Sequence, residues 1–136
     1  MKRKFVFTLI LCLSFIQLGE YANAAPKLTN KVKVNKDFKF MSDLRSALTK
    51  NGFVCTGYTK NEGVIGVREE GVCKFNGKEI TIDLFADSKS AKQIYNAVKA
   101  LLPGFAIGTN NNWYLIVDDE ATAELLSNGM KLKVYS

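Results

Sequence analysis

Histidine is missing from the 136-residue chain, and cysteine, tryptophan and proline are scarce. Without histidine, Ser-His-Asp and Cys-His catalytic arrangements cannot be built, and the commonest general base is absent. A structural zinc site needs about four ligands, usually Cys or His, and three cysteines cannot supply them. We therefore expect no enzymatic activity, no catalytic or metal-binding residues and no cofactor.

The first 24 residues have the composition of a secretory signal peptide. Basic residues 2–4 precede an apolar run, Phe5 to Leu18, and small residues follow it up to Ala24. At about 14 residues, the run is short against the roughly 20 that a membrane-spanning helix needs. We predict a signal peptide over residues 1–24, with an uncleaved signal anchor as the alternative. The mature protein is then secreted or extracytoplasmic, in the cell envelope, with no transmembrane segment.

Residues 25–40 form a lysine-rich leader. We predict a flexible spacer here, with an edge strand over the alternating residues 31–34 as the alternative. Clustered lysines are attracted to anionic wall polymers or lipid headgroups. Loss of the signal peptide lowers the net charge from +6 to about +4, which is too small to indicate nucleic-acid binding. The leader lysines are Lys27, Lys31, Lys33, Lys36 and Lys39.

Residues 41–136 predict one α+β domain. The order of its elements fits an antiparallel sheet of five to six strands with two to three helices on one face. The expected helices are one capped by Ser42 and stopped at Gly52, one that starts at Asp87 or Ser88, and one capped by Asp118 or Asp119 and stopped at Asn128-Gly129. The expected strands cover 53–58, 72–75, 78–84, 105–108, 113–117 and 130–134, with 64–68 as an additional candidate.

A two-residue hairpin is the strongest local prediction. Asn76-Gly77 supplies the two positive-φ residues of a type I′ turn between alternating strands. The register then places Lys74 opposite Glu79 and Cys73 opposite Ile80. The core face of the hairpin is predicted to carry Cys73, Phe75, Ile80, Ile82 and Leu84.

Two cysteines, Cys55 and Cys73, lie outside the predicted signal peptide. In a small exported domain such a pair is most often a disulfide. A redox pair favours a Cys-X-X-Cys spacing, and 17 residues intervene here. We predict a structural disulfide that closes a loop of about 19 residues and stabilises the fold by roughly 3 kcal/mol.

The acidic run Asp118-Asp119-Glu120 has two interpretations. With Asp83 or Asp87 it would offer oxygen ligands to a cation such as Ca²⁺. Acids at a helix start also cap free N–H groups and interact favourably with the helix dipole. We favour helix capping.

The turn before the predicted strand 113–117, together with the start of that strand, is our candidate binding surface. Aromatic rings beside adaptable amides suit contact with protein or glycan. The alternative is that Trp113 is simply a core residue, and strand alternation leaves at most one of Trp113 and Tyr114 free. The surface consists of Asn110, Asn111, Asn112, Trp113 and Tyr114.

Short motifs along the domain resemble uncharacterised small secreted proteins and lipoproteins of Gram-positive bacteria. These motifs are Leu44…Gly52-Phe53-Val54-Cys55, Gly71-Val72-Cys73, Gly77…Phe85 and Gly108…Trp113. The resemblance implies a paired-cysteine α+β domain with no named activity.

Three functional hypotheses follow. We favour an exported, monomeric, non-enzymatic binding domain of the inhibitor, immunity or envelope-binding type, whose partner is a protein or a cell-wall ligand and not nucleic acid. The first alternative is a structural component of the cell envelope or spore. The second is a Ca²⁺-dependent or carboxylate-based hydrolase.

Overall fold

The computed structural model describes residues 27–62 and 64–135, so the predicted signal peptide lies outside the described part of the chain. It confirms an α+β fold with three α-helices and one six-stranded antiparallel sheet. No helix within the described ranges is long and apolar enough to cross a membrane. The elements are α2 (Met41–Lys50), β1 (Thr56–Asn61), β2 (Glu69–Phe75), β3 (Lys78–Leu84), α3 (Ser88–Val98), the short 3₁₀ turn η2 (Lys99–Leu101), β4 (Phe105–Gly108), β5 (Trp113–Val117), α4 (Glu120–Met130) and β6 (Lys133–Tyr135).

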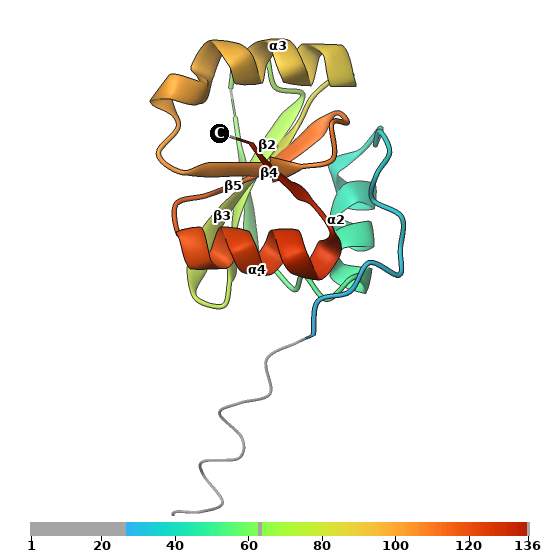
Figure 1. Cartoon of the computed structure of the whole chain (residues 1–136). Coiled ribbons are helices and arrows are strands. Elements are labelled where there is room, and N and C mark those ends of the chain that lie inside the picture. The colour runs from blue at the N-terminus through green and yellow to red at the C-terminus, as the bar shows by residue number, and fades with distance from the viewer. Residues whose placement is uncertain (1–26, 63, 136) are drawn as a thin grey trace, which may run out of the picture.

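The sheet has the strand order β1-β2-β3-β5-β4-β6, and helices cover both of its faces. Helices α2 and α4 lie on one face and α3 lies on the other (Figure 1). The prediction placed the helices on one face. The position of α3 follows from β5, which is apolar on both sides and therefore needs cover on both.

The larger core lies between the sheet and helices α2 and α4. The hairpin contributes to it as predicted: Asn76 and Gly77 have φ of 51° and 76°, and Cys73 pairs with Ile80. The disulfide is confirmed, with the Cα atoms of Cys55 and Cys73 5.5 Å apart. The core includes Leu44, Leu48, Phe53, Cys73, Phe75, Ile80, Ile82, Leu84, Ile107, Trp113, Leu115, Val117, Leu126 and Met130.

Several element boundaries differ from the prediction. Residues 64–68 are not a strand, and β2 starts only at Glu69. Helix α2 starts at Met41, so Ser42 lies inside its first turn and is not the cap. Gly129 does not stop α4, which runs on to Met130; a Cβ on Gly129 would lie 2.5 Å from the Cβ of Leu28. This glycine makes room for the leader.

The described part of the leader, residues 27–40, contacts the domain at several points and forms no strand, so it differs from both the flexible spacer and the edge strand of the prediction. Val34 and Phe38 are buried in the larger core, while the five leader lysines are exposed. The side-chain amide of Asn51 accepts from the Val32 N–H and donates to the Val32 carbonyl, both at 2.8 Å. The Asn51 side chain thus forms the backbone hydrogen bonds that a neighbouring strand would otherwise form.

Candidate functional site

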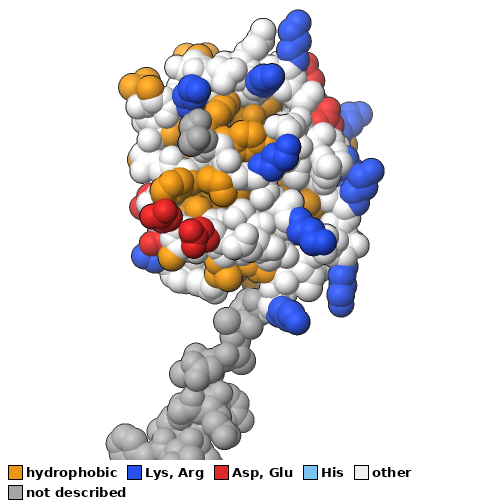
Figure 2. All heavy atoms as spheres, viewed as in Figure 1, with side chains coloured by type: hydrophobic (Ala, Val, Ile, Leu, Met, Phe, Trp, Pro, Cys, Tyr) orange, Lys and Arg blue, Asp and Glu red, His pale blue; other side chains and the backbone are white. Residues whose placement is uncertain are grey.

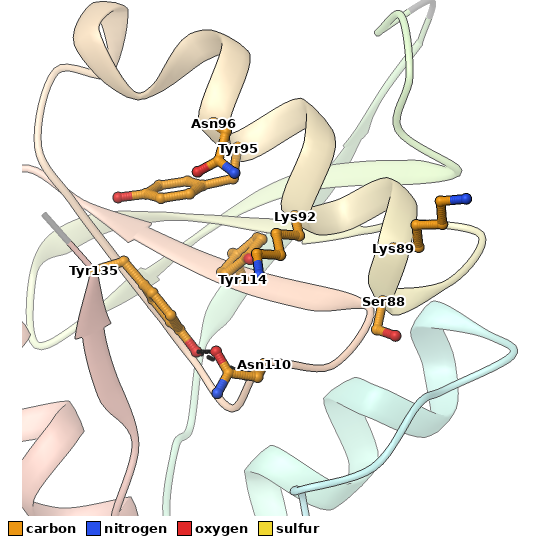
Figure 3. A pocket seen from close by; sticks show the side chains of 8 residues that line it. All are labelled: Ser88, Lys89, Lys92, Tyr95, Asn96, Asn110, Tyr114 and Tyr135. Atoms are coloured by element: carbon orange, nitrogen blue, oxygen red, sulfur yellow. Dashed lines mark hydrogen bonds between the residues drawn. The ribbon is translucent and has the colours of Figure 1, made fainter.

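A hollow of about 530 Å³ lies between α3, the β4–β5 turn and the strands β5 and β6. We call it the tyrosine pocket, because Tyr95, Tyr114 and Tyr135 form its inner wall (Figure 3). Ser88, Lys89, Lys92 and Asn96 of α3 line one side, and Asn110 of the β4–β5 turn lines the other. Helix α3 is positioned by Asp87, whose carboxylate accepts from the Ser90 N–H at 2.7 Å, as predicted for a cap.

The three tyrosine rings pack against one another. Ring centroids are 5.3 Å apart for Tyr95 and Tyr114, 5.4 Å for Tyr114 and Tyr135, and 5.8 Å for Tyr95 and Tyr135. These are distances at which aromatic pairs attract beyond their buried area. Gly108 lies opposite Tyr114 across the strand pair, and a Cβ on Gly108 would be only 3.0 Å from that ring. A small residue at this point therefore lets the cluster form.

A pair of short hydrogen bonds fixes Tyr135 to the β4–β5 turn. The Tyr135 hydroxyl donates to the Asn110 side-chain oxygen at 2.6 Å and accepts from the Asn110 N–H at 2.7 Å. Asn110 adopts a φ of 64°, a left-handed conformation that asparagine tolerates better than most residues. The pocket wall is therefore held in place before any ligand arrives.

The tyrosine pocket itself offers hydrogen-bond donors and positive charge. Burial raises the pKa of Tyr95, of Tyr114 and of Tyr135 above the usual value of 10. The phenols therefore stay protonated at neutral pH, and those of Tyr95 and Tyr114 can donate to a ligand, whereas the Tyr135 hydroxyl already donates to Asn110. Lys92 adds an exposed ammonium group beside the rings, and Lys89 is exposed one turn earlier on α3 with its side chain pointing away from them (Figure 3).

The predicted binding surface is only partly accessible. Trp113 is fully buried in the larger core, as its alternative interpretation held, and Asn112 is 1% exposed. The Asn112 side chain contacts Phe38 and Phe85 and no solvent-facing surface. Tyr114 is buried but forms the floor of the tyrosine pocket, and Asn110 is exposed at its rim.

Asn111 completes the predicted set. It is half-buried, and its side chain accepts from the Thr109 hydroxyl at 2.8 Å. Sequence reasoning missed Tyr95 and Tyr135. Two signals were available. Tyr95 lies on the apolar face of its helix, and Tyr135 follows Lys133 by two residues, so their side chains point to the same face of the last strand.

A second hollow, of about 340 Å³, lies on the other side of the same turn. We call it the leader hollow, because residues 30–35 of the leader form one wall. Thr109, Met130 and Lys131 form the rest. Thr109 lines this hollow and its neighbour Asn110 lines the tyrosine pocket, so adjacent residues of the turn line the two hollows.

A third, smaller hollow of about 170 Å³ contains a pair of carboxyl groups and mostly apolar walls. Glu70 and Asp83 are directly opposite on β2 and β3. Burial, then hydrogen bonding to Glu70, raises the pKa of Asp83 to about 8. The predicted register of the hairpin implies this pair. With Lys74 opposite Glu79, the residues four positions further from the turn, Glu70 and Asp83, are also opposite each other. Adjacent carboxyls that interact strongly titrate as one unit, whereas glycoside hydrolysis needs two carboxyls flanking a bond.

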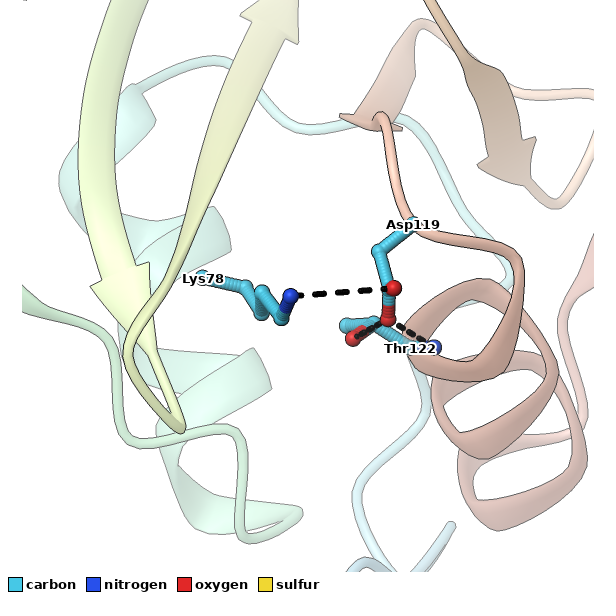
Figure 4. Close-up of polar contacts among 3 residues, drawn as sticks. All are labelled: Lys78, Asp119 and Thr122. Atoms are coloured by element: carbon cyan, nitrogen blue, oxygen red, sulfur yellow. Dashed lines mark hydrogen bonds and ion pairs between the residues drawn. The ribbon is translucent and has the colours of Figure 1, made fainter.

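The acidic run at 118–120 caps a helix, as we favoured. The carboxylate of Asp119 accepts from the Thr122 N–H at 2.9 Å and from the Thr122 hydroxyl, and lies 3.7 Å from the Lys78 ammonium (Figure 4). The hydrogen bonds from Thr122 lower the pKa of Asp119. Asp83 faces α3 on the opposite side of the sheet, so it does not join this run. Within residues 27–62 and 64–135 no three acidic or Cys side chains gather as a metal site.

Comparisons with protein-family models, with curated proteins and with solved structures found no match for this chain.

Proposed function

We propose that the protein is an exported, non-enzymatic binding domain and that the tyrosine pocket is its binding site. The observation that carries the proposal is the rigid wall of three tyrosines, locked by the paired hydrogen bonds between Tyr135 and Asn110. Rigid aromatic rings contribute contact area at little cost in conformational entropy.

The polar groups around this wall indicate the kind of ligand. Asn96 and Ser88 offer a side-chain amide and a hydroxyl, and both are exposed on α3. Amides and hydroxyls beside aromatic rings suit the alternating polar and apolar faces of a glycan, or a polar protein loop. The disulfide that braces the domain is compatible with an oxidising, extracytoplasmic compartment.

Blocking the pocket tests the proposal. The Asn96→Trp substitution places a large ring at the pocket mouth, and Gln93→Trp places the same ring on an exposed part of α3 that does not line the pocket. With isolated bacterial cell wall and its soluble glycan fragments as probes, we expect binding by the wild type and by Gln93→Trp, and a loss of at least about tenfold in Asn96→Trp.

The same experiment tests whether the protein leaves its ligand chemically unchanged. Fragments recovered after incubation should have unchanged masses. Cleaved fragments, or equal binding by both tryptophan variants, would contradict the proposal.

A further inference from the structure

The two hollows beside the β4–β5 turn share one electrostatic character. Lys89 and Lys92 line the tyrosine pocket, and Lys31, Lys33 and Lys131 line the leader hollow. Among the described residues, no Asp or Glu lines either hollow. Figure 2 shows most lysine and arginine side chains of this face on its right-hand side, with the acidic ones mainly at the lower left.

A sixth lysine lies next to the turn whose residues line both hollows. Lys133 on β6 pairs with Gly108, the residue that immediately precedes the β4–β5 turn, and its side chain is exposed. The lysines therefore follow a path from the N-terminal end of α3, across β6, to the leader. We call this path the lysine track; it consists of Lys89, Lys92, Lys133, Lys131, Lys31 and Lys33.

The track is held in place because the leader is fixed to the domain. Val32 is bound through both of its backbone groups to Asn51, and Val34 accepts from the indole N–H of Trp113 at 3.2 Å. Alternation in this segment turns the valines inward and Lys31 and Lys33 outward. A flexible spacer would present the same charges without a fixed path, so the packing gives the lysines a geometry.

We propose that the lysine track binds a linear anionic polymer with hydroxyl groups, which crosses the β4–β5 turn and occupies both hollows. The inference rests on the proposed function and names the ligand class of its site. Ammonium groups at intervals suit repeated carboxylate or phosphate groups, while the asparagines and phenols of the two hollows suit the hydroxyl groups between them. A single small anion would not use lysines on both sides of the turn.

The test compares oligomers that differ in one property at a time. The probes are a long uronic acid oligomer, its disaccharide, its fully methyl-esterified form, an oligomer of glycerol phosphate and an oligomer of glutamate. We expect the purified protein to bind the long uronate or the glycerol phosphate oligomer, and the tighter of the two identifies carboxylate or phosphate as the anion. Binding should weaken with added salt, because exposed charges are screened.

Paired substitutions locate the contact. Lys89→Gln with Lys92→Gln removes the pocket end of the track, and Lys31→Gln with Lys33→Gln removes the leader end. Lys74→Gln with Lys99→Gln is the matched control, since both lysines are exposed and line neither hollow. For the long oligomer we expect about a tenfold loss from either track pair and little change from the control. For the disaccharide, we expect only one of these two double substitutions to weaken binding.

Three results would overturn the inference. They are equal losses from the control pair, binding of the glutamate oligomer as tight as that of the hydroxylated anions, and no dependence on oligomer length. Binding of the methyl-esterified oligomer alone, abolished by Asn96→Trp, would overturn the inference and leave the proposed function in place. No binding of any oligomer, or of cell wall, would contradict both.

Discussion

The side chain of Asn112 pairs with the backbone of Phe38 as a neighbouring strand would. Its oxygen accepts from the Phe38 N–H at 2.8 Å, and its nitrogen donates to the Phe38 carbonyl at 2.7 Å. The same nitrogen donates to the Phe85 carbonyl at 3.0 Å. One buried amide therefore joins the leader, β5 and the β3–α3 connection.

Replacement of Asn112 by alanine should destabilise the fold strongly. Three backbone groups of Phe38 and Phe85 would lose their partners, and each buried unpaired group costs about 1–3 kcal/mol. Allowing for relaxation, we expect a loss of about 3 kcal/mol in the free energy of unfolding, measured with urea. Asn128→Ala, on the exposed side of α4, is the control and should stay within about 0.5 kcal/mol of wild type. A loss below about 1 kcal/mol in Asn112→Ala would show that the leader is not held by this amide.

The packed leader should resist trypsin in the native protein. It carries exposed lysines, but cleavage requires local unfolding, and Val34 and Phe38 oppose that by being buried. We expect slow cleavage after Lys31, Lys33 and Lys36 in the wild type and fast cleavage in Asn112→Ala, measured by mass spectrometry. Wild-type cleavage at the rate of the urea-unfolded chain would restore the flexible spacer that the sequence suggested.

Local features of the fold could be predicted from the sequence because neighbouring residues determine them. The Asn76-Gly77 turn fixes the register of β2 and β3, and Asp87 and Asp119 each cap the helix that follows. The path of the leader could not be predicted in this way. It depends on pairings such as Phe38 with Asn112, which are 74 residues apart, and no local pattern encodes them.

The residues of the candidate site also divide into those that local sequence could predict and those that depend on the fold. Asn110 and Tyr114 were identified because an asparagine-rich turn precedes an aromatic strand. Tyr95 and Tyr135 come from α3 and β6, and only the sheet order β5-β4-β6 and the position of α3 bring them to the same hollow. Trp113 and Asn112 are buried because the leader covers that end of β5.

The disulfide should contribute about 3 kcal/mol to stability, since it closes a loop with a sequence separation of 18. The double substitution Cys55→Ala with Cys73→Ala should therefore lower the free energy of unfolding by about that amount. Reducing agent should destabilise the wild type and leave the double variant unchanged. Denatured protein without the signal peptide should show no free thiols before reduction, and two reactive thiols per chain would contradict the bond.

The Glu70–Asp83 pair should make stability depend on pH. The pKa of Asp83 is about 8 in the folded protein and starts from 3.8 as an ordinary aspartate. Between these values the folded state holds a proton that the unfolded state has lost. The free energy of unfolding should therefore fall as the pH rises from about 4 to about 8, and this loss of stability should persist in full above pH 8.

The Asp83→Asn variant isolates this effect, because asparagine keeps the shape of the side chain and cannot titrate. The groups that face Asp83 are Glu70, which also accepts from the Asn61 amide at 2.7 Å, and Tyr114, its partner on β5. We expect Asp83→Asn to gain stability relative to wild type as the pH rises, by a few kcal/mol at pH 9, in urea unfolding at several pH values. Asp118→Asn, at an exposed position, is the control for the loss of one carboxyl group. If the two variants behave alike, Asp83 is ionised in the fold and its carboxyl pair does not share a proton.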